Sequence, residues 1–261
     1  MNRRFESRVS PLRIALFLLA IVALLLMAHL AAEAVRTTVG ADLPDRATAM
    51  WNLDEENNVP TWFASMVLAL VGFALAFVGM MKYQERDRHW WQWFAIALIP
   101  LFLSLDDMAQ LHEALSQPLS DEYGFGGLFH WAWLVVALPV VAVLTVLFLP
   151  FLIRLPARTA VLLLAGAGIT FSGGVVLEMF EGWRVDASGQ GGLLLFSMVT
   201  VQEVAEMIGS IIALYAIIDY AGGYRPELVL HIERDDLPFV GESRPHSGEV
   251  GLDHLEPAEQ S

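Results

Sequence analysis

The chain has 261 residues, of which 56% are hydrophobic and 17% are charged, and its mean hydropathy is +0.54. Soluble domains carry about 25% charged residues, so this composition excludes an ordinary soluble domain. The absence of cysteine excludes a disulfide framework, thiolate metal sites and cysteine nucleophiles. The net charge of −14 argues against a nucleic-acid partner.

Six apolar runs predict an all-α, polytopic membrane protein with six transmembrane helices. Each run has roughly 20 residues or more, which is enough to cross a hydrocarbon core about 30 Å thick. The runs cover residues 12–34, 60–81, 89–113, 128–149, 157–183 and 193–218. We therefore expect a six-helix transmembrane domain over residues 1–221.

The two ends of the chain need separate interpretations. The first run follows several arginines, as the core of a cleaved signal peptide would. Its length and the lack of a small-x-small cleavage site favour a retained anchor instead. Residues 222–261 are polar and acidic, which predicts a mostly disordered cytoplasmic tail with at most a short strand over residues 228–232.

The distribution of basic residues indicates the orientation. Of the 15 Lys and Arg residues, 12 lie on one side of the predicted spans. Because basic connections stay in the cytoplasm, both termini are expected in the cytoplasm. An even number of spans also requires both termini on one side.

Ionisable residues interrupt four of the six spans near the predicted outer face. They are His29 and Glu33 in the first run, Asp106, Asp107, His112 and Glu113 in the third, Glu178 and Glu181 in the fifth, and Glu203 and Glu206 in the sixth. Counted at about 1.5 Å per residue, they reach similar heights in the outer third of the bilayer or just outside it. We therefore expect one acidic pocket beneath the external membrane face.

Helical spacing places these acids on common faces. The three predicted stripes are Asp106, Gln110 and Glu113, then Gly174, Glu178 and Glu181, and then Glu203, Glu206 and Ser210. Gly166, Thr170 and Gly174 continue the second stripe toward the cytoplasm. Small residues at this spacing let membrane helices approach closely, so we expect the fifth span to be central.

Buried carboxylates need protons, partners or a cation, because a charge near the membrane centre costs about 2.5–3.5 kcal/mol. Oxygen ligands with one or two imidazoles suit Zn²⁺, Mn²⁺ or Fe²⁺ better than Mg²⁺ or Ca²⁺. The predicted divalent-metal ligands are Asp106, His112, Glu113, Glu178, Glu181, Glu203 and Glu206. Glu206 and Asp107 are the candidate catalytic carboxylates, each able to act as a general base.

Simpler interpretations stand beside each of these assignments. Glu178 and Glu181, and likewise Asp107, His112 and Glu113, could be solvated helix ends. Glu203 and Glu206 could be protonated, hydrogen-bonded structural groups. His29 and Glu33 fit packing or rim positions. The acids Asp54, Glu55 and Glu56 before Pro60 fit an ordinary helix start.

Three strings, WNLDEENNVPTWFAS, LFLSLDDMAQLHEAL and EVAEMIGSIIALYAIIDY, together resemble an uncharacterised family of bacterial multi-pass membrane proteins. The resemblance extends over roughly residues 51–220. It implies a location in the bacterial inner membrane and no particular activity. The chain lacks the HxxxH helix of ceramidase-like membrane hydrolases and the paired Glu-x-x-His motifs of di-iron proteins.

Three functional hypotheses follow. The first is a membrane metalloprotein that hydrolyses a lipid or lipid-linked substrate, because the acids share one depth. The second is a component of a cation- or proton-coupled transporter, because buried carboxylates form proton relays. The third is a non-catalytic subunit whose acids meet protein partners in the membrane. Haem bound through His112 and another histidine is a minor fourth alternative.

Overall fold

The computed structural model describes residues 10–39 and 45–224, which form helices and no strand. The helices are α1 (Pro11–Val39), α2 (Asp45–Ala49), α3 (Val59–Gln84), α4 (Trp90–Ala109), α5 (Leu111–Tyr123), the 3-10 turn η2 (Gly127–Phe129), α6 (Leu134–Leu152), α7 (Ala157–Phe171), the π-helix η3 (Ser172–Leu177), α8 (Glu178–Ser188) and α9 (Leu193–Tyr224). The predicted strand over residues 228–232 and nearly all of the predicted tail lie outside the described residues.

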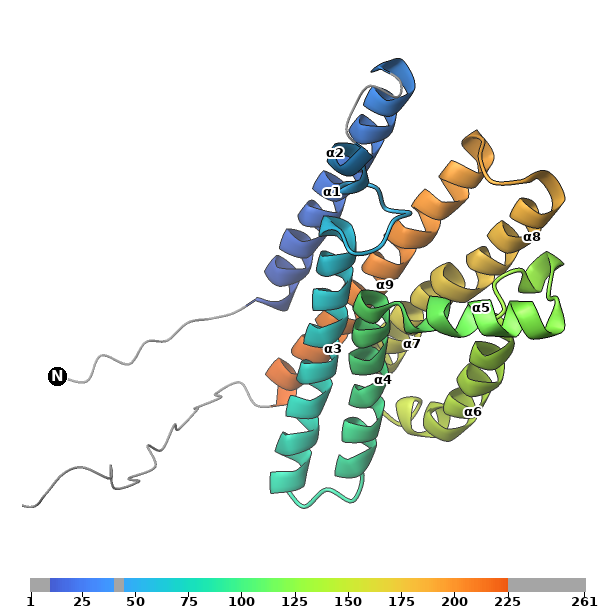
Figure 1. Cartoon of the computed structure of the whole chain (residues 1–261). Helices are drawn as coiled ribbons and strands as arrows, with labels where there is room; N and C mark the ends of the chain where they lie inside the picture. The colour runs from blue at the N-terminus through green and yellow to red at the C-terminus, as the bar shows by residue number, and fades with distance from the viewer. Residues whose placement is uncertain (1–9, 40–44, 225–261) are drawn as a thin grey trace, which may run out of the picture. The chain divides into compact units, whose positions relative to one another are not determined.

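Six helical segments are long and apolar enough to cross a membrane, as expected. They are α1, α3, α4, α6, the continuous segment from α7 through α8, and α9. The predicted all-α architecture with six membrane spans is therefore confirmed at this level (Figure 1).

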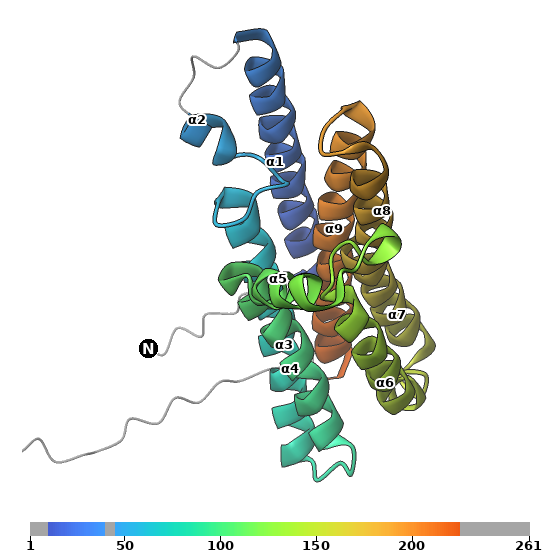
Figure 2. The ribbon, with the colours of Figure 1, turned by 45° about the vertical axis from the view of Figure 1, so that its right-hand side comes forward.

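The central helix is α9, and this differs from the expectation that the fifth span is central. It packs against α1, α3, α7, η3 and α8, and Figure 2 shows it between α1 and α8. Its buried Met207, Ile211, Leu214 and Ile217 join apolar residues of α1, α3 and α4 in the core. Van der Waals packing of such side chains holds these helices against one another in the described bundle.

Small residues bring α7 and α9 into close contact, as their spacing predicts. A Cβ atom added to Gly166 would lie 2.7 Å from the Gly209 carbonyl oxygen. One added to Gly209 would lie 2.6 Å from the Gly166 carbonyl oxygen and 2.7 Å from the Thr170 nitrogen. The two backbones therefore touch where any side chain would separate them.

The third predicted span is interrupted, which the sequence pattern did not indicate. Helix α4 ends at Ala109, and Gln110 adopts the left-handed conformation with φ 53° and ψ 42°. Helix α5 then starts at Leu111 and runs across the direction of the other helices (Figures 1 and 2). Asp106 and Glu113 therefore belong to different helices and do not share one helical stripe.

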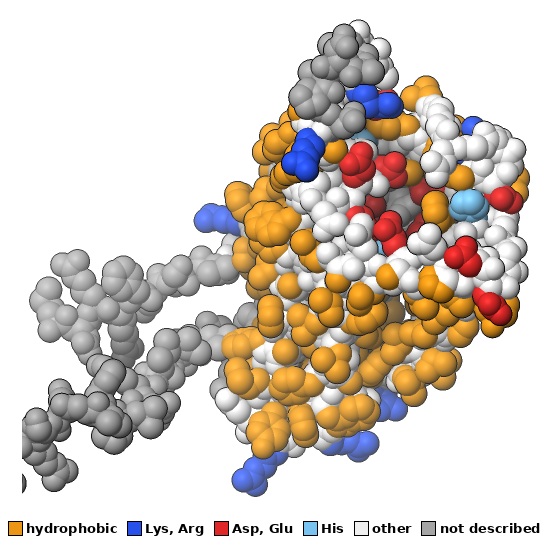
Figure 3. Space-filling model, viewed as in Figure 1, with side chains coloured by type: hydrophobic (Ala, Val, Ile, Leu, Met, Phe, Trp, Pro, Cys, Tyr) orange, Lys and Arg blue, Asp and Glu red, His pale blue; other side chains and the backbone are white. Residues whose placement is uncertain are grey.

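The ends of the bundle differ in charge. At the end with α2, α5 and the turn at residues 189–192, here called the acidic end, acidic side chains gather on the face that Figure 3 shows. The opposite end, here called the basic end, contains the turns between α3 and α4 and between α6 and α7. The cations at these two turns, among the residues that the structure describes, are Lys82, Arg86, Arg88, Arg154 and Arg158.

The contact between α7 and α9 predicts unequal effects of two matched substitutions. Gly209→Ala should lower stability by about 1–3 kcal/mol, because the new methyl group overlaps backbone atoms of α7. Gly168→Ala should be neutral or stabilising, because nothing lies within 4 Å of the added Cβ atom. Thermal unfolding in detergent measures both; equal melting temperatures for the two variants would contradict the close contact.

Candidate metal centre in an acidic recess

The geometry of the site begins at His112, the second residue of α5. Its backbone N–H donates to Asp106 Oδ1 at 2.9 Å, and its ring Nδ1 lies 3.2 Å from Asp106 Oδ2. The other ring nitrogen, Nε2, lies 3.4 Å from Glu56 Oε1. The left-handed turn at Gln110 makes this possible, because it folds the start of α5 back onto the last turn of α4.

A compact group of metal-ligand atoms surrounds this histidine. Glu56, His112 and Glu113 each offer one ligand atom, and these atoms lie within 4.8 Å of one another. Glu56 and His112 are partly buried, whereas Glu113 is exposed. Two carboxylates and one imidazole form a donor set that suits Zn²⁺, Mn²⁺ or Fe²⁺.

A second set of acids lies deeper in the protein. Glu203 and Glu206 of α9 interact electrostatically with Asp107 of α4 and Glu178 of α8. Protein surrounds both glutamates, yet each keeps partial solvent exposure. Figure 3 shows acidic side chains gathered around a hollow in this face, and we assign the four interacting acids to it. We call this feature the acidic recess.

The two sets of acids are electrostatically connected. Glu178 interacts with His112, Glu56 and Asp106, and Asp107 interacts with the same three residues. The acids of the recess therefore lie within electrostatic range of the Glu56–His112–Glu113 group.

The π-helix η3 and its glycines make room for Glu206. A Cβ atom on Gly173 would lie 2.7 Å from Glu206 Cγ, and one on Gly174 would lie 3.0 Å from Glu206 Oε2. A π-helix is rare and often marks a functional position. Here the glycines of η3 allow the Glu206 carboxylate to lie directly against the helix that carries Glu178.

Polar side chains orient the two glutamates of α8. Trp133 Nε1 donates to Glu178 Oε1 at 2.9 Å. With the Gln202 amide oriented so that its nitrogen faces Glu181, both carboxylate oxygens of Glu181 lie 2.8 Å from that nitrogen. Gln202 also interacts with Glu206, so it connects the acids of α8 and α9.

Two oxygen atoms at the site are buried without a hydrogen-bond partner. They are Glu56 Oε2 and Asp107 Oδ2. Leaving a buried polar atom unsatisfied costs about 1–3 kcal/mol. These two atoms therefore have unused capacity to accept a hydrogen bond or bind a cation.

His112 carries positive charge at the mouth of the recess. Burial by itself lowers the pKa of His112, but the hydrogen bond to Asp106 and the negative charges of Asp106, Glu178 and Glu56 raise that pKa to about 9. Burial raises the pKa of Glu56, and attraction to His112 offsets this only in part. Asp106 therefore contributes more than Glu56 to holding the imidazolium charge.

His29 fixes the loop that carries Glu56. Its Nδ1 accepts the Leu53 backbone N–H at 3.1 Å, so Nε2 carries the proton and donates to Thr200 Oγ1 at 3.1 Å. The ring is 2% exposed and stacks on Phe196. Asn58 completes the loop by capping α3 through Thr61 and donating to three carbonyl groups. Glu56 is thus presented to His112 by a tightly bonded loop.

The predicted site residues separate into three groups. Asp106, His112 and Glu113 lie at the mouth, and Asp107, Glu178, Glu203 and Glu206 line the recess, with Glu181 buried beside Gln202. His29 and Glu33 have packing and rim contacts, since Glu33 pairs with Arg36 at 2.7 Å. Sequence reasoning missed Glu56 as a site residue. The signal that could have indicated it is the acidic run Asp54–Glu55–Glu56, which directly precedes the second predicted span at its outer end.

The pKa of His112 predicts a pH-dependent contribution to stability. Its pKa is about 9 in the folded protein and about 6.5 in an unfolded chain. The contribution, on the order of 3 kcal/mol, is therefore complete below about pH 6.5 and is lost as pH rises through about 9. Thermal unfolding across this range should show the loss in the wild type and in a His89→Gln control. A wild-type profile identical to that of His112→Gln would contradict it.

Comparison with known proteins places the chain in a family. No curated protein and no solved structure matches it. The family described as "Domain of unknown function (DUF8692)" matches residues 15–220. This match extends from the first membrane span to the last and includes the three strings on which the expected resemblance rests. The chain therefore belongs to the DUF8692 family.

Proposed function

We propose that this protein is a membrane metalloenzyme that binds one divalent cation at Glu56, His112 and Glu113 and hydrolyses a lipid or lipid-linked substrate. The observation that carries the proposal is the convergence of these three ligand atoms within 4.8 Å, from a loop and a helix distant in sequence. The unpartnered oxygen atom of Glu56 adds support, because cation binding would satisfy it.

The surroundings of His112 suit a metal ligand. Its Nδ1 faces Asp106, whereas Nε2 faces Glu56. Metal-bound histidines usually donate their second ring N–H to a carboxylate, which fixes the ring and strengthens the ligand. Asp106 is therefore assigned as the orienting carboxylate, with Nε2 as the metal ligand.

The deeper carboxylates supply the chemistry of hydrolysis. A divalent cation lowers the pKa of bound water to near 7. Asp107 or Glu206 would accept a proton from the attacking water and return a proton to the leaving group of the substrate. Asp107 interacts electrostatically with His112, and Glu206 interacts with Glu178, which supports their assignment as candidate general bases.

The orientation follows from the distribution of basic residues. The positive-inside rule assigns the basic end and both termini to the cytoplasm of a bacterial inner membrane. The acidic end then faces the outer leaflet, where lipid substrates reach the recess. A transporter is less well supported, because Met207, Ile211, Leu214 and Ile217 make an apolar core between the recess and the basic end.

Metal binding tests the proposal directly. Full-length protein in detergent should bind about one Mn²⁺ or Zn²⁺ per chain. Glu56→Gln and His112→Gln should each weaken binding by about tenfold or more, because each removes a proposed ligand. Glu122→Gln, an exposed acid on the same helix α5, is the matched control and should bind as the wild type does. Absence of bound metal, or equal binding by all four proteins, would overturn the proposal.

The metal affinity should also depend on pH in a defined direction. His112 must lose its proton to bind the cation, and its pKa is about 9. The apparent affinity for Mn²⁺ should therefore rise by about tenfold per pH unit as pH approaches 9. The slope should be smaller in His112→Gln, and an identical slope in both proteins would exclude His112 as a ligand.

A further inference from the structure

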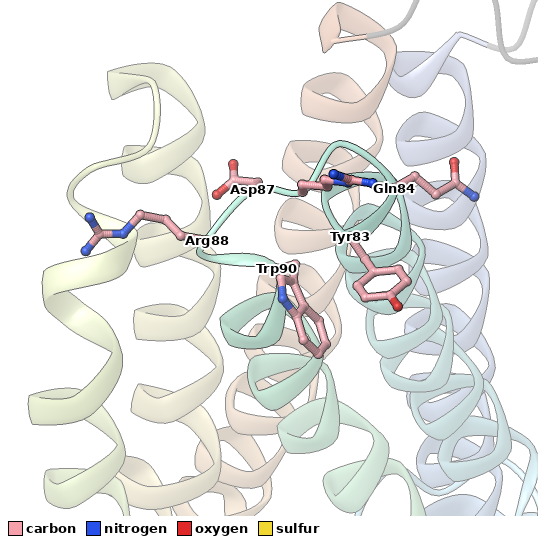
Figure 4. A pocket seen from close by; sticks show the side chains of 6 residues that line it. Tyr83, Gln84, Asp87, Arg88 and Trp90 are labelled. Atoms are coloured by element: carbon pink, nitrogen blue, oxygen red, sulfur yellow. The ribbon is translucent and has the colours of Figure 1, made fainter.

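A second cavity lies at the basic end, away from the acidic recess. Its volume is about 420 Å³, and it is lined by Tyr83, Gln84, Arg86, Asp87, Arg88 and Trp90 (Figure 4). These residues form the turn between α3 and α4, at the ends of two membrane spans. The proposed metal centre uses none of them.

The arginines give this cavity an uncompensated positive charge. Asp87 is already engaged, because its Oδ1 accepts the His89 N–H at 2.8 Å and its Oδ2 lies 3.8 Å from Lys82 Nζ. Arg86 and Arg88 are exposed, and within the described residues neither guanidinium has a hydrogen bond or an ion pair. Both are free to bind an anion.

The backbone at Arg86 supports a role for its side chain. The Arg86 N–H donates to the Tyr83 carbonyl and the Asp87 N–H to the Lys82 carbonyl, which is the Schellman ending of a helix. Arg86 occupies the left-handed position of this motif, with φ 58°. Glycine is strongly favoured there, so the arginine adopts a backbone conformation that its side chain does not favour. Such outliers point to a function of the side chain.

Two aromatic rings provide an apolar wall beside these charges. Tyr83 and Trp90 pack edge to face with ring centroids 5.0 Å apart. Both are exposed, and in Figure 4 their rings lie side by side below the turn, whereas Arg88 points away from them. Tyr and Trp prefer the boundary between membrane and water, where their rings contact both headgroups and the first carbons of acyl chains.

We propose that this cavity binds an anionic phospholipid, with Arg86 at the headgroup phosphate, Arg88 adding positive charge at the rim of the cavity, and Tyr83 and Trp90 along the adjoining acyl chain. Guanidinium groups match phosphate geometry through paired hydrogen bonds. The ring pair and the position at the end of two spans favour a lipid over free phosphate. The site is independent of the proposed metal centre.

The experiment compares lipid binding in full-length protein by native mass spectrometry. Phosphatidylglycerol should bind about tenfold more tightly than phosphatidylcholine. Arg86→Gly should lose this preference yet melt at the same or a higher temperature, because glycine suits the left-handed position. Arg13→Gln removes one positive charge from α1, outside the cavity, and should retain the preference.

Three outcomes would overturn the proposal. Equal loss in Arg86→Gly and Arg13→Gln would indicate diffuse attraction between the membrane and net charge. Displacement of the lipid by inorganic phosphate or glycerol phosphate at matched ionic strength would indicate a site for soluble phosphate. Unchanged lipid preference in both Arg86→Gly and Arg88→Gln would exclude both guanidinium groups from the site.

Discussion

Several carboxylates held in one poorly hydrated space repel one another and lose the water that would otherwise stabilise their charges. This constraint governs the acidic end of the bundle, where Asp107, Glu178, Glu203 and Glu206 interact across three helices. His112 supplies positive charge only at the mouth of the recess. Protons or a bound cation must relieve the remaining repulsion. The recess therefore indicates more about the chemistry of this protein than any other described part of it.

The backbone is shaped to allow this concentration of charge. Close contact between Gly166 and Gly209 lets α7 lie against α9, and the glycines of η3 leave space for the Glu206 carboxylate. The left-handed Gln110 turns the chain so that His112 meets Asp106. The site therefore depends on small residues and on the left-handed backbone of Gln110 as well as on its charged residues.

Hydropathy and charge were sufficient to predict the spans and the gathering of acids at one end, because both depend on local composition. The break at Gln110 was missed, since no glycine or proline marks it and the contact between His112 and Asp106 that accompanies it joins two different helices. Glu56 was missed because the acids before Pro60 fit an ordinary helix start, while its partner His112 is distant in sequence. The central position of α9 depends on contacts between helices, which the sequence of a single helix does not indicate.

The wide turn of η3 gives this segment one residue more than a continuous α-helix would need. A π-turn closes through an i→i+5 hydrogen bond, whereas an α-turn closes through i→i+4, so the wide turn of Ser172–Leu177 absorbs the extra residue. Deleting one residue would therefore let α7 and α8 join as one regular α-helix with Glu178 and Glu181 in nearly the same directions, but it would close the wide turn whose glycines lie against Glu206. The space for that carboxylate thus depends on a single surplus residue in the chain.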